Sequence, residues 1–116
     1  RKFKTFKIAH SDIEYSYKYA NRDALNALKP ENVDEVIIIK NSFITDTTIS
    51  NLAFFDGKKW LTPKTPLLKG TKREELLRKN FLTEADIKEE DLKNFKKIAM
   101  INAVIGFYEI KNYDII

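Results

Sequence analysis

Four consecutive β-branched residues, Val36 to Ile39, constrain the fold of this 116-residue chain more than any other feature. Branching at Cβ restricts the side chain and favours extended backbone. An apolar run with no polar alternation is typical of a strand that is buried on both faces. We therefore predict a buried strand in the segment VDEVIIIKN, followed by a turn at Asn41-Ser42.

The segments around this strand mix hairpins with single helices. Aromatic and β-branched residues favour a strand over 2–9. Apolar residues at helical spacing predict a helix over 19–29, which Pro30 ends. After the turn at 41–42, the segment 43–61 reads as a strand, a polar kink and a second strand, and then as a hairpin turn at Asp56-Gly57 and a short strand.

The second half of the chain continues the same pattern. Pro63 and Pro66 bracket a loop, and Gly70 opens a helix over 71–80. A strand and a short helix are predicted over 81–95, and two apolar strands over 96–110. This order predicts an α+β fold with one domain over residues 1–116.

The composition excludes several classes of protein. The chain has no cysteine and one histidine, His10, so we predict no disulfide, no thiolate zinc site and no metal centre. The net charge is 21 − 17 = +4, with both signs mixed along the chain, which gives little support for a nucleic-acid surface. No apolar run reaches the length of a membrane span, and no signal peptide is evident. We expect a soluble cytoplasmic protein.

Four polar features interrupt the apolar pattern where a strand ends or a helix begins. Ligand sites collect at such points. The four features are Lys18 with Asn21-Arg22, Asp46 with Asn51, the turn Gly70-Thr71-Lys72-Arg73, and the pair Asn102-Ala103.

Four segments containing these residues resemble, in order and spacing, the C-terminal part of the class IV aminotransferases. The segments are KYANR, ITDTTISNLAF, LTPKTPLLKGTKREELL and AMINAVIGF. This family comprises the fold-type IV pyridoxal-phosphate enzymes, including 4-amino-4-deoxychorismate lyase and the branched-chain and D-amino-acid aminotransferases. The resemblance is strongest to the lyase-like branch. It implies the C-terminal domain of that fold, with a strongly curved mixed sheet and flanking helices.

The resemblance also implies a cofactor, pyridoxal 5′-phosphate, and a role for each polar feature. Lys18 would form a Schiff base with the cofactor and then move a proton at the substrate carbon. A lysine does this best when partial burial favours its neutral amine, and Tyr17 and Tyr19 are consistent with such burial. Asp46 would pair with the cofactor's ring nitrogen, where the family usually has a longer glutamate.

The remaining implied roles concern the cofactor's phosphate and the loops around it. The backbone amides of Thr71 and Lys72 would bind the phosphate at the start of a helix, with help from the Thr71 hydroxyl. Asn102 and Ala103 would supply a second set of donors. The resemblance also implies that Asn51 shapes the cofactor loop and that Arg22 lies near the ring oxygen or the phosphate.

Simpler interpretations of these residues stay open. Lys18 could be a solvated side chain. The stretch Asp46-Thr47-Thr48 could be a capped turn at a strand break, which does not exclude pairing with the ring nitrogen. Gly70-Thr71 could be only a helix start. Asn102 could satisfy backbone groups at a strand kink.

The predicted function is that of an aminodeoxychorismate lyase-like enzyme of folate biosynthesis, which takes a small amino substrate and releases pyruvate to give 4-aminobenzoate. The alternative is an aminotransferase acting on branched-chain or D-amino acids. A more distant alternative is a small basic binding module without catalysis. By resemblance we expect a homodimer, with neither nucleic acid nor membrane as a partner.

The chain opens at RKFKTFKIA, without an initiator methionine. It also lacks the N-terminal domain in which the family carries an arginine that clamps the phosphate. We therefore expect a fragment, one piece of a cleaved protein or a shortened relative.

Overall fold

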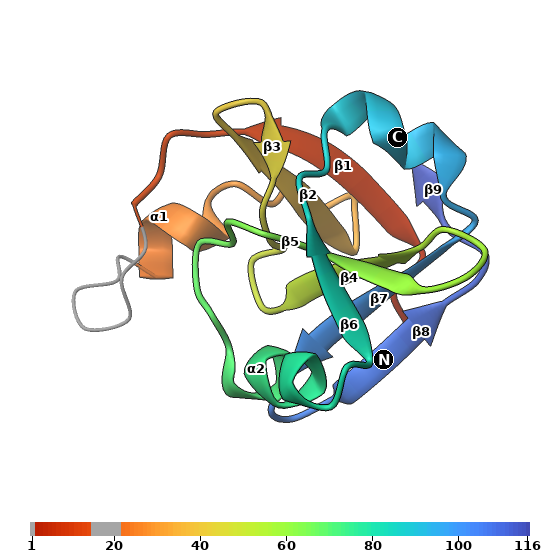
Figure 1. The fold of residues 1–116 in the computed structure, drawn as a ribbon. Coiled ribbons are helices and arrows are strands. Elements are labelled where there is room, and N and C mark those ends of the chain that lie inside the picture. Colours follow the sequence, from red (N-terminus) through yellow and green to blue (C-terminus); the bar gives the residue numbers. More distant parts are fainter. Residues whose placement is uncertain (1, 15–21) are drawn as a thin grey trace.

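The computed structural model describes residues 2–14 and 22–116. Its elements follow in chain order as shown in Figure 1. They are β1 (Thr5–His10), α1 (Arg22–Asn26), β2 (Glu35–Lys40), β3 (Phe43–Ile44), β4 (Asn51–Phe55), β5 (Trp60–Pro63), α2 (Thr71–Arg78), β6 (Leu82–Ala85), the 3₁₀ helix η1 (Glu89–Asn94), β7 (Lys97–Asn102), β8 (Gly106–Ile110) and β9 (Asp114–Ile115). Within these described ranges, no helix has the length and apolar character needed to cross a membrane.

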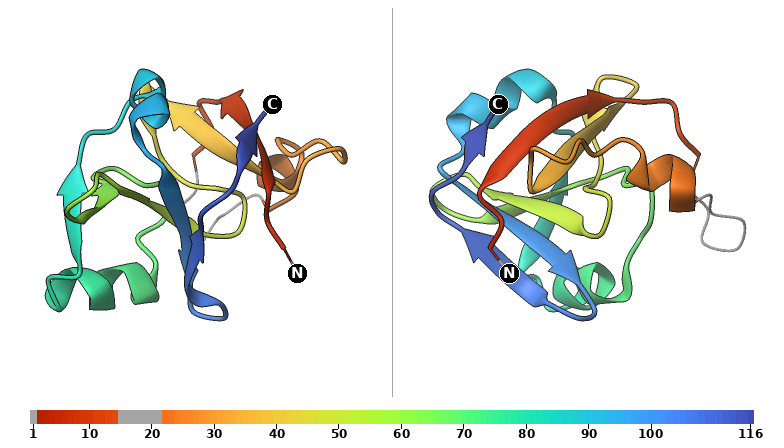
Figure 2. Two further views of the ribbon diagram at one scale, coloured as in Figure 1. Left: turned by 90° about the vertical axis from the view of Figure 1, so that its right-hand side faces the viewer. Right: turned by 180° about the vertical axis from the view of Figure 1, so that it is seen from behind.

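The strands form two mixed sheets, one with the order β3-β2-β1-β9 and one with the order β6-β5-β4-β7-β8. In the first sheet β1 runs parallel to both of its neighbours, β2 and β9. In the second sheet β4 is antiparallel to β5 and to β7, and β5 is parallel to β6. Figure 2 shows how strongly the strands twist and curl. In the view of Figure 1, α2 lies below the second sheet.

The predicted doubly buried strand is β2, and its alternating side chains contribute to two different apolar clusters. Ile37 and Ile39 face the core between the two sheets. Val36 and Ile38 face the other way and pack with Leu25 of α1. Successive side chains of a strand point to opposite faces, so the continuous apolar run serves both clusters.

The second sheet is built on the same principle. Leu52 and Phe54 of β4 belong to the core between the sheets. Ala53 between them packs instead with Leu76 of α2 and Leu82 of β6. The layers therefore run α1, first sheet, shared core, second sheet, α2. This arrangement confirms the α+β class and the curved mixed sheet with flanking helices.

Some boundaries differ from those that the sequence predicted. In the described part of the chain, α1 begins at Arg22 and already ends at Asn26, and residues 19–21 of the predicted helix lie outside the described residues. The strand expected to end at Leu61 extends to Pro63, because β6 pairs with it up to Pro63↔Ala85. The two-residue strand β9 was not predicted, since it carries too few residues for a pattern.

The predicted turn at Asn41-Ser42 is confirmed. Lys40 pairs with Phe43, so the loop between β2 and β3 has two residues, and their φ angles are 53° and 75°. Positive φ at both central residues matches the right-handed twist of a hairpin, and asparagine tolerates it better than most residues do.

Arg73 fixes the start of α2 against the edge of the second sheet. Its side chain is 1% exposed. The guanidinium donates hydrogen bonds to the Pro63 carbonyl (3.0 Å) and to Glu84 (2.7 Å), and it also pairs with Glu74. Pro63 ends β5 and Glu84 lies on β6. The Arg73 side chain therefore ties the first turn of α2 to both strands.

We predict that Arg73→Ala lowers the free energy of unfolding by about 3 kcal/mol, because a buried cation and its hydrogen bonds are lost together. Arg78→Ala is the matched control, since Arg78 is exposed on the same helix and should change stability by about 0.5 kcal/mol or less. Urea unfolding followed by the fluorescence of Trp60, the chain's one tryptophan, measures both variants. Equal stabilities would contradict this role of Arg73.

Candidate functional site

A pocket of about 540 Å³ lies between the loop that follows β3, the start of α2 and the end of β7. It brings together six of the eight residues to which the family resemblance gives a direct site role: Arg22, Asp46, Asn51, Thr71, Asn102 and Ala103. Lys18, the seventh, lies outside the described residues. The eighth, Lys72, is next to the pocket in α2 but does not line it.

The side chain of Asn51, at the start of β4, connects three parts of the pocket. Its amide nitrogen donates to Asp46 Oδ1 (3.1 Å) and to the Leu68 carbonyl (2.7 Å). Its amide oxygen accepts a hydrogen bond from the Gly70 backbone N–H (3.2 Å). A strand residue thus fixes both a carboxyl group and the turn that leads into α2.

Gly70 is required by this contact rather than by its backbone angles, since its φ is −66°. A Cβ atom at this position would lie 2.6 Å from Asn51 Oδ1, far inside van der Waals contact. The helix α2 begins directly after Gly70, without a side-chain cap. The first backbone N–H groups of a helix lack acceptors within it, so those of Thr71 and Lys72 suit an anion.

Asp46 is 4% exposed. Its Oδ2 accepts hydrogen bonds from the backbone N–H groups of Leu67 (2.8 Å) and Leu68 (3.2 Å). Burial raises the pKa of the Asp46 carboxyl from 3.8 to about 7, although the hydrogen bonds from Asn51, Leu68 and Leu67 and the charge of Arg73 oppose this rise. Near neutral pH this carboxyl can therefore hold or release a proton.

The loop between Asp46 and Asn51 is held by its own side chains and by the pocket walls. Thr47 Oγ1 accepts hydrogen bonds from the N–H groups of Ile49 (3.2 Å) and Ser50 (3.0 Å), which confirms the capped turn. The Thr48 carbonyl accepts a hydrogen bond from Arg22 Nη1 (2.6 Å), and the Ile49 carbonyl accepts one from Asn102 Nδ2 (3.0 Å).

Asn102 and Lys72 use their side chains for local structure. Asn102 Oδ1 accepts from the N–H groups of Val104 (2.9 Å) and Ile105 (2.8 Å), and so satisfies backbone groups in the turn between β7 and β8. The Lys72 ammonium pairs with Glu75 Oε2 at 2.9 Å, along its own helix. Its backbone amide is therefore the group of Lys72 that the pocket can use.

Two features of the pocket were missed by the sequence reasoning. The backbone amides of Leu67 and Leu68 hold Asp46. Every residue type except proline carries such a donor, so the side chains at these positions do not indicate it. Glu35, buried behind Thr48, was read only as part of a strand. A glutamate at the start of an apolar run was a usable signal, because buried carboxylates occur where they have partners.

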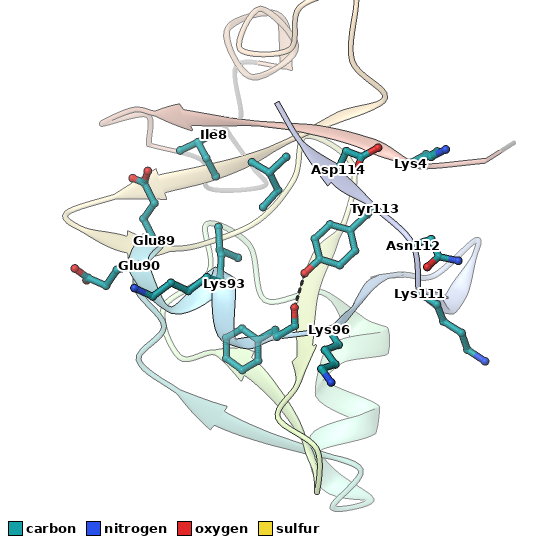
Figure 3. Close-up of a pocket in the computed structure, with 13 residues that line it drawn as sticks. Lys4, Ile8, Glu89, Glu90, Lys93, Lys96, Lys111, Asn112, Tyr113 and Asp114 are labelled. Carbon is teal, nitrogen blue, oxygen red and sulfur yellow. Dashed lines mark hydrogen bonds between the residues drawn. The ribbon is translucent and has the colours of Figure 1, made fainter.

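A larger hollow of about 1000 Å³ lies elsewhere, between η1 and the segment that leads into β9. Figure 3 shows that the ammonium groups of Lys4, Lys93 and Lys111 point in different directions rather than toward one point. Tyr113, which lines this hollow, donates to the Phe95 carbonyl (2.9 Å). Acidic side chains also line this hollow, so it does not have the converging donors of an anion site.

We predict that the cofactor-free chain becomes less stable as pH rises from about 4 to about 7. The folded-state pKa of Asp46 lies above its ordinary value, so the folded chain holds this proton more tightly than the unfolded chain does. Between pH 5 and pH 8 the loss should be on the order of 2 kcal/mol. Unfolding measured against pH, with Asp46→Asn beside the natural chain, checks this. An identical pH dependence in both would refute it.

We predict that Gly70→Ala lowers the free energy of unfolding by about 2 kcal/mol, because the new methyl group overlaps the Asn51 side chain. In an Asn51→Ala background the same change should cost about 0.5 kcal/mol or less, since the overlapping atom is gone. A double-mutant cycle measures the difference. Equal costs in the two backgrounds would exclude the contact as the reason for glycine.

The sequence of the chain is similar to those of known proteins. The family described as amino-transferase class IV matches residues 16–113. An uncharacterised Haemophilus influenzae protein is 48% identical over 107 residues, which cover 90% of the chain and 57% of that protein. A proposed aminodeoxychorismate lyase of Schizosaccharomyces pombe is 33% identical over 75 residues, which cover 60% of the chain and 32% of that protein. The chain thus spans between a third and somewhat over half of these relatives.

Solved structures show the same fold. The crystal structure of a proposed 4-amino-4-deoxychorismate lyase from Haemophilus somnus 129PT has a TM-score of 0.83 at 39% identity, over 91% of the chain and 56% of that protein. The branched-chain amino acid aminotransferase from Escherichia coli has a TM-score of 0.70 at 14% identity, over 97% of the chain and 44% of that protein. On the family match and these relatives, the chain belongs to the class IV aminotransferase family.

Proposed function

We propose that this chain is the cofactor-binding part of a pyridoxal-phosphate-dependent enzyme of the aminodeoxychorismate lyase type. One observation carries the proposal: in a member of this family, a buried carboxyl group and an uncapped helix start face one pocket and are joined by a single amide side chain, that of Asn51. The two groups suit the two ends of pyridoxal phosphate, a basic ring nitrogen and a phosphate.

The residues present fit the phosphate end. The amides of Thr71 and Lys72 lie at the positive end of the α2 dipole, which favours an anion. Gly70 leads directly into this helix start and lines the same pocket. Across the pocket, Asn102 and Ala103 border the same space. We therefore assign the phosphate to this end.

Asp46 fits the ring-nitrogen end. A protonated ring nitrogen beside it would supply an opposite charge at short range and would lower the pKa of the carboxyl toward the ionised form. The carboxylate would then hold the proton on that nitrogen. When bound, the cofactor supplies an electron sink for the substrate. The shorter aspartate is held in place by the amides of Leu67 and Leu68.

Lys18 is the amine that we assign to covalent attachment of the cofactor and to proton movement at the substrate carbon. This assignment rests on the family pattern KYANR. Four residues later in that pattern, Arg22 reaches the pocket and bonds the Thr48 carbonyl. The position of Arg22, the one described residue of the pattern, supports this assignment.

For the reaction we favour the lyase, in which the substrate's ring loses a proton and its side chain leaves and takes up a proton to become pyruvate, so that 4-aminobenzoate for folate synthesis remains. Its support is the naming of the relatives at 39% and 33% identity as proposed lyases. The second candidate is an aminotransferase, which the branched-chain enzyme of the same fold favours. Pyruvate release without a keto-acid acceptor would identify the lyase, and dependence on an acceptor would identify the aminotransferase. In either case we propose a homodimer.

We predict that pyridoxal phosphate added to the chain, followed by borohydride reduction and peptide mapping, labels Lys18 above all other lysines. Lys18→Ala should abolish the visible absorbance of the bound cofactor and keep the fold. Lys111→Ala is the control, since Lys111 is exposed and remote from the pocket and its loss should change neither result. Labelling spread over many lysines, or absorbance that survives in Lys18→Ala, would overturn the assignment.

A further inference from the structure

Glu35 is a buried carboxylate that the proposed chemistry does not use. It lies at the start of β2 and is 2% exposed. Its carboxylate accepts hydrogen bonds from the Thr48 N–H (2.9 Å) and from the Thr48 hydroxyl (2.8 Å to Oε1 and 2.7 Å to Oε2). It also accepts one from the Val36 N–H (3.0 Å). No lysine or arginine in residues 2–14 or 22–116 forms an ion pair with it.

Stability alone is a poor reason for a carboxylate at this position. Burying a charged group is costly, and well-packed apolar residues often replace buried charges without loss. Among the described residues, the hydrogen bonds that the Glu35 side chain accepts from outside its own strand come from Thr48, a residue 13 positions away that lines the pocket. The reason for Glu35 is therefore to be sought in what Thr48 does.

Thr48 contacts Arg22 on its other side. The Thr48 carbonyl accepts the hydrogen bond from Arg22 Nη1 at 2.6 Å. A guanidinium has five N–H donors in a fixed plane, so one short bond to a fixed carbonyl sets the direction of the rest. Leu25 anchors α1 independently, because it packs in the cluster with Val36 and Ile38. The backbone of Arg22 can thus stay in place while its side chain turns.

We propose that Glu35 is a positioning residue of the pocket, which holds Thr48 so that the Thr48 carbonyl orients the guanidinium of Arg22 toward an anionic or carbonyl oxygen of the bound ligand. The identity of that ligand rests on the proposed function, whereas the link from Glu35 to Arg22 does not. A purely structural Glu35 would affect the free energy of unfolding and leave the Arg22 side chain unchanged.

The test combines a measurement without ligand and one with pyridoxal phosphate, on the 116-residue chain and its variants Glu35→Leu and Glu35→Gln. Glutamine keeps an amide oxygen for the Thr48 N–H, so it is the conservative replacement. Glu109→Leu is the control, because Glu109 is exposed on β8 and remote from the pocket. The first readout is the NMR signal of the Arg22 guanidinium in the ligand-free chain. The second is the dissociation constant for pyridoxal phosphate.

In Glu35→Leu we expect the Arg22 guanidinium signal to move to the position of a solvated arginine, and the dissociation constant to rise on the order of tenfold, as for the loss of one charge-assisted hydrogen bond. Glu35→Gln and Glu109→Leu should keep the natural signal and change the constant less than about threefold. An unchanged Arg22 signal in a folded Glu35→Leu chain would overturn the proposal.

If Glu35→Leu does not fold, Thr48→Val decides in its place, with Thr48→Ser as its conservative partner. Valine removes the hydroxyl that bonds both carboxylate oxygens, so the Arg22 signal should shift in Thr48→Val and not in Thr48→Ser. No shift in Thr48→Val would overturn the proposal. A natural chain that binds no pyridoxal phosphate would count against the proposed function, while the ligand-free signal would still decide the role of Glu35.

Discussion

The hydrogen bonds of the Asn51 side chain hold the loop before β4 and the loop between β5 and α2 against the start of β4. Asp46 precedes β4, Leu68 belongs to the loop after β5, and Gly70 leads into α2, yet one amide group bonds to all three. Asn51 itself is fixed because β4 lies inside the second sheet, where it pairs with both β5 and β7. Because the sheet fixes Asn51, its hydrogen bonds fix the positions of the Asp46 carboxyl group and of the start of α2. The distance between these two groups has to match one ligand.

The pocket contains an unfavourable charge that a ligand could offset. Asp46 is buried deeply enough to raise its pKa to about 7, and its three hydrogen bonds only partly compensate for the loss of water. A cation that enters the pocket beside Asp46 would restore the ionised form. Natural proteins often accept lower stability at sites that bind or react. The burial of Asp46 fits this pattern.

Local sequence predicted the strands and turns well, because their signals are short in range. The apolar run Val36 to Ile39 by itself indicates a strand that is buried on both faces. The pair Asn41-Ser42 by itself indicates a tight turn. Six of the eight candidate site residues line one pocket, which fits a family pattern whose spacing reflects the fold.

The parts that could not be predicted depend on contacts distant in sequence or on the backbone. The bond between Glu35 and Thr48 exists only because the loop after β3 returns beside β2. The amides that hold Asp46 belong to Leu67 and Leu68, whose side chains gave no indication of this role.

The most direct test of the account is to record backbone amide NMR spectra of the chain while pyridoxal phosphate is added. The account predicts that the largest shifts occur at residues 70–72 and 102–103, with smaller ones around Asp46. Shifts concentrated instead at residues 93–96 and 111–114, in the hollow lined by scattered lysines, would contradict it.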